Sequence, residues 1–112
     1  MKRSFWLLPL LAACAGGEVA TISCAGEVRL QNAGSLAVEQ VYFSAAGPAN
    51  WGRDLLAPAM LPPGGDHLVQ AAPGQNAVRI VFANGRAAEL PTMDVCRTPN
   101  LRIRPTDLLA SP

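Results

Sequence analysis

The sequence from Leu36 to Leu56, LAVEQVYFSAAGPANWGRDLL, predicts a strand followed by a capping loop. β-branched and aromatic residues dominate the part that ends at Ser44, and these residue types favour extended backbone. Small residues follow, and they lead to the segment that starts at Trp51. We therefore expect this stretch to supply one strand of a sheet and a loop that returns over it.

Large aromatic side chains are scarce in this chain. After residue 15 they are Tyr42, Phe43, Trp51 and Phe82, which are therefore expected to supply most of the bulky core volume. Alternation places Val38 and Tyr42 on the face of the strand opposite Phe43. Apolar residues on both faces favour a strand that is covered on both sides, and the loop with Trp51 as a buried plug is the expected second cover.

The rest of the chain contains short β-prone segments separated by turn-forming residues. A turn at residues 32–35 predicts that the two strands beside it form a hairpin, and Asn84-Gly85 favours a type I′ hairpin turn. One helical turn is expected at Leu55–Met60, and Pro58 limits it. The expected strands are Glu18–Cys24, Glu27–Gln31, Leu36–Ser44, His67–Ala71, Asn76–Ala83, Arg86–Leu90, Thr92–Cys96 and Leu101–Arg104.

This pattern predicts an all-β fold of about seven to eight short strands. The expected architecture is a small antiparallel β-sandwich, and a small β-barrel is the alternative. The expected organisation is a signal peptide at residues 1–13, a lipidated cysteine with a tether and first β-prone segment at 14–25, the sandwich at 26–104, and a frayed C-terminal tail at 105–112.

The N-terminal segment MKRSFWLLPLLAA has two basic residues followed by an apolar run of about nine residues. A membrane-spanning helix needs roughly 20 apolar residues, so this segment fits a secretory signal better. The residues from Leu11 to Cys14, LAAC, resemble the lipobox of bacterial lipoproteins. That resemblance implies that Cys14 is lipidated and anchors the protein to a bacterial membrane, facing the periplasm. Ordinary cleavage after Ala15, which would give a secreted or soluble periplasmic protein, and an uncleaved segment are the alternatives.

Charge and cysteine usage limit the remaining possibilities. Without residues 1–13 the chain has seven arginines and eight acidic residues, and no basic patch suggests nucleic acid. In an oxidising compartment Cys24 and Cys96 are expected to form a disulfide, although two unpaired buried thiols are the alternative. One histidine, His67, and two scattered cysteines have no ligand spacing, so neither a metal nor another cofactor is expected.

The order of motifs from Asn32 to Gly85, with the block W-G-x-D-x-L at residues 51–56, resembles a group of small exported bacterial domains that carry no assigned activity. The resemblance covers about residues 27–96, and the block is its most specific element. It implies a compact β domain and no catalytic assignment.

The block also supplies the candidate contact residues Trp51, Arg53 and Asp54, together with Tyr42. In a binding site the indole would stack on a ligand or partner, and the carboxylate would bind a donor or a cation. In the structural interpretation Trp51 closes the end of the sandwich, and Asp54 accepts backbone N–H bonds in its own loop.

Catalytic signals are weak. His67 is a candidate base for a nucleophile such as Ser44, but no G-x-S-x-G elbow supports a nucleophile, so an enzyme is not expected. Two interpretations of Arg79, Arg102 and Arg104 stay open: they line one strand face for a carboxylate or phosphate partner, or they form the solvated side of a half-buried sheet.

The expected function is that of a non-catalytic, membrane-anchored envelope lipoprotein with a protein-binding or structural role. A small-ligand-binding or enzyme-inhibitor module in the periplasm is the alternative. The expected partners are the membrane and an envelope protein, and the sequence leaves the oligomeric state open.

Overall fold

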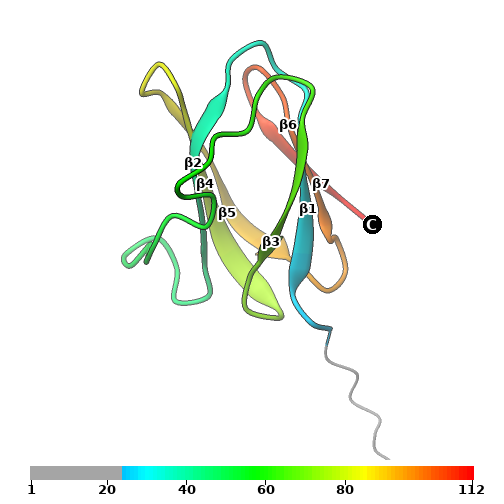
Figure 1. Ribbon diagram of the computed structural model, residues 1–112. Helices are drawn as coiled ribbons and strands as arrows, with labels where there is room; N and C mark the ends of the chain where they lie inside the picture. Colours follow the sequence, from blue (N-terminus) through cyan, green and yellow to red (C-terminus); the bar gives the residue numbers. More distant parts are fainter. Residues whose placement is uncertain (1–23) are drawn as a thin grey trace, which may run out of the picture.

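The computed structural model describes residues 24–112 as a two-layer β-sandwich (Figure 1). The strands are β1 Glu27–Asn32, β2 Val38–Ser44, β3 Asp66–Gln70, β4 Gln75–Phe82, β5 Ala87–Asp94, β6 Asn100–Ile103 and β7 Leu108–Ser111. One sheet has the order β3-β1-β6-β7 and the other the order β2-β4-β5. The predicted all-β sandwich is confirmed, and the two separate sheets exclude the barrel.

The predicted signal peptide, Cys14, its tether and the β-prone segment Glu18–Cys24 fall on or extend into residues 1–23, outside the described residues. Within residues 24–112 there is no helix that could cross a membrane. The helical turn expected at Leu55–Met60 is absent from this part of the chain, where the backbone makes turns and bends.

Side chains from both sheets meet in a core of aliphatic residues. Alternation in β1 buries Val28 and Leu30, which are completely inaccessible. Phe43 and Phe82 also lie in this core, but Tyr42 is only half-buried. The aromatic residues therefore supply less of the core volume than expected. The other fully buried apolar side chains are Val38, Val41, Val78, Ile80, Val95, Leu101 and Ile103.

The strand β2 carries a bulge that changes which residues face the core. Its register against β4 shifts between Val38 and Gln40. One extra residue reverses the alternation of side chains, so Val38 is buried on the same side as Val41 and Phe43. The prediction that Val38 shares a face with Tyr42 is therefore wrong.

The predicted hairpin between the first two strands is also wrong, because β1 and β2 belong to different sheets. The chain crosses between the sheets at Asn32, which is completely buried. Its Nδ2 donates to the carbonyls of Leu36 (2.9 Å) and Leu61 (3.1 Å), while its Oδ1 accepts the N–H of Gly34 (3.0 Å). These bonds hold the crossing in place. The turn-forming composition of residues 32–35 suits such a crossing as well as a hairpin.

Near the end of the chain, the predicted frayed tail at 105–112 contains the strand β7. It pairs antiparallel with β6, and Leu108 is buried in the core. Arg104 N donates to Asp107 O at 2.9 Å and closes the turn between these two strands. The segment forms a strand because it pairs with β6 and because Leu108 packs into the core.

The β4–β5 hairpin has a different turn from the one expected. Gly85 N donates to Phe82 O (2.8 Å), and Phe82 N donates to Arg86 O (2.8 Å). These bonds enclose a three-residue loop, in which Gly85 has φ +86°. A type I′ turn would instead enclose only Asn84 and Gly85.

Candidate functional site

The side chain of Asp54 faces the backbone of the protein. Its Oδ1 accepts the N–H of Val41 and the N–H of Leu56, both at 2.9 Å. Leu55 N donates to the carbonyl of Val41 at 2.8 Å. The loop thereby satisfies both backbone groups of Val41 on the free edge of β2. This is the structural interpretation of Asp54 that the sequence offered.

The same loop pairs again with β2 farther along. Leu61 N and Val38 O are 2.9 Å apart, and Val38 N and Leu61 O are 2.8 Å apart. Leu56 and Leu61, which flank the connection, are both buried. We call residues 54–61 the edge cap, because they cover one edge of the three-stranded sheet.

Trp51 packs beside Tyr42, with ring centroids 6.4 Å apart and ring planes tilted by 53°. Both side chains are half-buried, and Tyr42 Oη donates to Gln40 Oε1 at 2.7 Å. Tyr42 alternates with buried Val41 and Phe43 and so faces away from the core. Trp51 thus lies next to an outward-facing residue of β2, on the face that its loop was expected to cover. The ring is half-buried, so the prediction of a buried plug is wrong.

Among the predicted contact residues, only Tyr42 and Trp51 form a pair. Arg53 is exposed, and the Asp54 carboxylate is directed to the backbone. The four residues do not line any of the larger hollows together. The strongest sequence motif in the chain therefore builds the edge cap and its flank.

Cys24 and Cys96 form a disulfide, with their Cα atoms 5.4 Å apart. It joins a residue three positions before β1 to the connection between β5 and β6. Asp94 Oδ1 accepts the N–H groups of Cys96 (3.0 Å) and Arg97 (3.3 Å), which fixes the turn around the second cysteine. The two sheets are thereby linked covalently at one end of the sandwich.

The outer face of the four-stranded sheet carries a different set of residues. One row across β3, β1, β6 and β7 is Leu68, Arg29, Asn100 and Ser111, and the next is Asp66, Gln31, Arg102 and Leu109. We call these eight residues the arginine face. In β1 and β6 they alternate with completely or almost completely buried aliphatic residues, so their side chains point away from the core.

Two leucines stand out on the arginine face. Leu68 is 54% exposed and Leu109 is 44% exposed, one at each edge of the sheet. Between them, Arg29 contacts Asp66 at 3.2 Å, and Arg102 donates to Gln31 Oε1 at 2.9 Å. Leu109 lies directly opposite Arg102 in the register. Apolar contact area thus alternates with guanidinium groups across one continuous surface.

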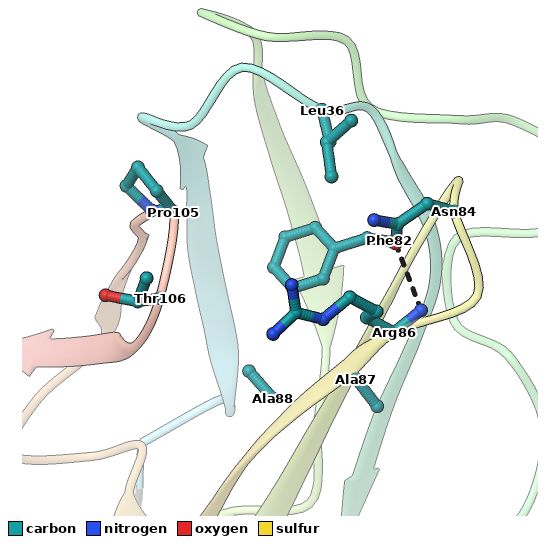
Figure 2. A pocket seen from close by; sticks show the side chains of 8 residues that line it. All are labelled: Leu36, Phe82, Asn84, Arg86, Ala87, Ala88, Pro105 and Thr106. Carbon is teal, nitrogen blue, oxygen red and sulfur yellow. Dashed lines mark hydrogen bonds between the residues drawn. The ribbon is translucent and has the colours of Figure 1, made fainter.

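A shallow hollow of about 420 Å³ lies on the arginine face. The residues that line it are Arg29, Gln31, Asn100, Leu101, Arg102, Leu109 and Ser111. A second hollow, at the end of the sandwich between the β4–β5 turn and the β6–β7 turn, measures only about 60 Å³ (Figure 2). Phe82 and Arg86 point into it. Sites for small organic ligands usually measure about 300–1,000 Å³, a size that the first of these two hollows has and the second does not.

The sequence identified part of this surface. Arg102 was a candidate, but Arg79 lies on the other sheet, where it pairs with Glu89, and Arg104 pairs with Asp107. The three arginines therefore do not share a face. Leu109 was missed because its strand was taken for a tail. The alternation of Leu101 and Ile103 with Arg102 was the signal that one side of this region is solvated.

The possible base and nucleophile lie in different sheets. His67 is exposed on β3, and Ser44 Oγ, at the end of β2, donates to Asn50 O at 2.6 Å. Within residues 24–112, no group of three or more histidine, cysteine or acidic side chains is arranged to hold a metal ion.

Neither a family model, nor a curated protein, nor a solved structure matches this chain. The resemblance of residues 27–96 to a group of exported domains, and of residues 11–14 to a lipobox, therefore stays a prediction.

Proposed function

We propose that this protein is a non-catalytic lipoprotein of the bacterial cell envelope. Cys14 holds it on a membrane, facing the periplasm, and the sandwich binds another protein through the arginine face. The arrangement of Leu68, Arg29, Arg102 and Leu109 on that face is the observation that carries the binding role.

Two properties of the arginine face favour a protein partner. The large apolar side chains at both edges of the sheet would leave water on contact, which is the main favourable term in association. Arginine is enriched at protein interfaces because its long apolar stem packs while its planar head donates several hydrogen bonds. Neither arginine is buried by its present contact with Asp66 or Gln31. Both are therefore accessible to a partner.

The anchor rests on the LAAC segment at residues 11–14. Several acyl chains at roughly 0.8 kcal/mol per buried CH₂ would hold the protein on a membrane. Cell fractionation tests this proposal. Cys14→Ser should move the protein from the membrane to the soluble fraction, whereas Ala15→Ser should leave it in the membrane. An intact mass showing a mature chain that starts at Gly16 without acyl groups would overturn it.

The binding role is tested by purification from detergent-solubilised membranes with a tag on the full chain. Arg102→Glu and Leu109→Asp, both on the arginine face, should each lose a stoichiometric protein partner that the wild type retains. Arg53→Glu is the matched control, because Arg53 is an exposed arginine beside the edge cap. Loss of the partner in Arg53→Glu, and its retention in the other two variants, would assign binding to the Trp51 region instead.

A small-ligand or inhibitor module is the second candidate. The hollow of about 420 Å³ favours it, since two guanidinium groups and the Ser111 hydroxyl could bind an anionic group there. Mass spectrometry of the purified protein under native conditions separates the two candidates. A bound small molecule that is lost in Arg102→Glu would favour the ligand module over a protein partner.

A further inference from the structure

The outer edge of β3 has three residues whose backbone groups point away from the sheet. Pairs that exchange hydrogen bonds alternate with pairs that do not in an antiparallel ladder. Asn32 N donates to Gly65 O and Ala71 N donates to Gly26 O, each at 2.9 Å, which fixes the phase of the β1–β3 ladder. Counting from these bonds, His67 and Val69 bond to β1. The N–H and C=O groups of the intervening residues Asp66, Leu68 and Gln70 point outward.

The other sheet edges are occupied or interrupted. The edge cap binds the backbone of Val38 and Val41 on β2. The strand β5 contains Pro91, which has no N–H, and β5 and β7 approach each other on their side of the sandwich. The strand β3 has no proline, no bulge in its pairing and no lysine. Its edge therefore lacks the proline, the bulge and the lysine that commonly prevent pairing with another strand.

We propose that β3 is the interface at which two copies of this chain pair. The two β3 strands lie antiparallel, with the two-fold axis at Leu68, and join the four-stranded sheets into one sheet of about eight strands. This inference goes beyond the proposed function and does not depend on the lipid anchor.

The sequence of β3 is self-complementary in this register. Leu68 faces Leu68 of the second copy, which covers a side chain that is 54% exposed in one copy. Asp66 faces Gln70 of the second copy, so a carboxylate meets an amide and no like charges oppose each other. His67 faces Val69 in the same register. A two-fold interface requires this kind of match between a surface and itself.

The backbone adds a regular set of bonds. Three outward residues from each copy form three facing pairs, and each pair exchanges two hydrogen bonds, giving about six in total. A single pair of five-residue strands is smaller than a standard stable interface of about 1,200–2,000 Å². The dimer is therefore expected to dissociate on dilution, and covalent trapping in cells is the appropriate measurement.

The test uses Leu68→Cys in the full chain, expressed and exported in bacteria. Facing Cα atoms in a hydrogen-bonded antiparallel pair are about 5.5 Å apart, within the range of a disulfide. Leu109→Cys is the matched control, because it replaces a similarly exposed leucine on the opposite edge of the same sheet. On a non-reducing gel, Leu68→Cys should give at least several-fold more covalent dimer than the control.

The register is tested with two further variants, Asp66→Cys and Gln70→Cys. When both are expressed together with different tags, mixed dimers should exceed by several-fold the dimers that either variant forms alone. Efficient linking of each variant to itself would indicate a parallel pair and overturn the proposed arrangement.

Two other results would overturn the proposal. One is equal dimer formation by Leu68→Cys and Leu109→Cys. The other is a covalent product between Leu68→Cys and a different protein in place of the dimer, which would show that the edge accepts a partner strand. Urea unfolding of monomeric Leu68→Cys, with its new thiol alkylated and the Cys24–Cys96 disulfide intact, checks that the variant is folded, which is expected for a substitution at an exposed position.

Discussion

The edges of β2 and β3 lie on the same side of the sandwich but differ in how their backbone groups are used. On β2, the edge cap forms hydrogen bonds with the backbone of Val38 and Val41. The Asp54 carboxylate accepts the N–H of Val41, which no backbone carbonyl of the edge cap accepts. On β3, three residues, the exposed Leu68 among them, present backbone groups that pair with no other strand of residues 24–112. Figure 1 shows the long connection that follows β2 before it reaches β3.

The difference shows that the β2 edge of this small domain is covered against pairing with another strand, whereas the β3 edge is open to it. The connection between β2 and β3 is long enough to cover one edge, and its buried leucines hold it there. The most distinctive motif of the chain, the block W-G-x-D-x-L, contributes residues to the cover of this edge. The neighbouring edge has a short, regular strand that no segment within residues 24–112 pairs with on its outer side, which favours a specific contact with another chain.

The largest expected effect comes from breaking the covalent link at the end of the sandwich near β3. The disulfide spans 72 residues, and closing a loop of that length should stabilise the fold by about 4 kcal/mol on the chain-entropy model. Cys24→Ser should lower the free energy of unfolding by about that amount in urea titrations. Peptide mapping of the wild type under non-reducing conditions must recover Cys24 joined to Cys96, and free thiols at both positions would contradict the structure.

The next largest effect should come from opening the covered edge. Asp54→Ala removes the acceptor of two backbone N–H groups, so the free energy of unfolding should fall by about 3 kcal/mol. Asp54→Asn keeps an acceptor oxygen and should lose less. Arg53→Ala is the control, because a substitution at this exposed neighbour should stay within about 0.5 kcal/mol of the wild type. Equal effects at residues 53 and 54 would show that the carboxylate does not hold the edge cap.

A smaller loss is expected at Trp51, which flanks the covered edge. Its half-buried ring contacts Tyr42, so Trp51→Ala should cost about 1–2 kcal/mol. The variant should therefore remain folded at room temperature. Trp51 is the only tryptophan after residue 6, and in the chain without its N-terminal segment its emission should be partly quenched by acrylamide. If acrylamide did not quench Trp51 at all, and Trp51→Ala were unfolded, the tryptophan would be a buried plug after all.

The smallest effect should come from the turn beside the opposite edge of the four-stranded sheet. Arg104 donates to Asp107 at 2.6 and 2.7 Å, and this hydrogen bonding lowers the pKa of the Asp107 carboxyl. A carboxyl whose pKa is lower in the folded state stabilises the fold above its unfolded pKa of about 3.9, and this contribution disappears as pH falls through the folded pKa.

The measurement is the difference in urea midpoint between the wild type and Asp107→Asn. It should be small at neutral pH, because both side chains are exposed, and it should vanish in acid. Glu39→Gln, an exposed position outside this pair, controls for the change in net charge. A difference that grows toward acid pH would contradict the assigned sign.

Local patterns predicted the parts of the fold that depend on neighbouring residues. The aliphatic alternation of β4, the turn after Phe82 and the backbone role of Asp54 were all accessible from the sequence. The turn type was wrong, because the same Asn84-Gly85 pair fits a three-residue loop with the glycine at its end.

Contacts between distant segments were less accessible. A turn at residues 32–35 has the same composition whether the chain returns to its own sheet or crosses to the other, and the buried bonds of Asn32 decide this in the folded protein. Four residues at Leu108–Ser111 are too few to show a strand period between two prolines. The arginine face could not be assembled for the same reason, because it requires the order of four strands.

The parallel pairing of β1 with β6 affects when the protein can fold. These two strands are central neighbours in the same sheet, yet β6 begins at Asn100 while β1 begins at Glu27. Ribosomes add roughly 5–20 residues per second, so the partner of β1 is synthesised about 4–15 seconds after it. The four-stranded sheet cannot be completed during this interval. Under the export proposed above, the four-stranded sheet therefore stays incomplete until almost all of the chain has been made.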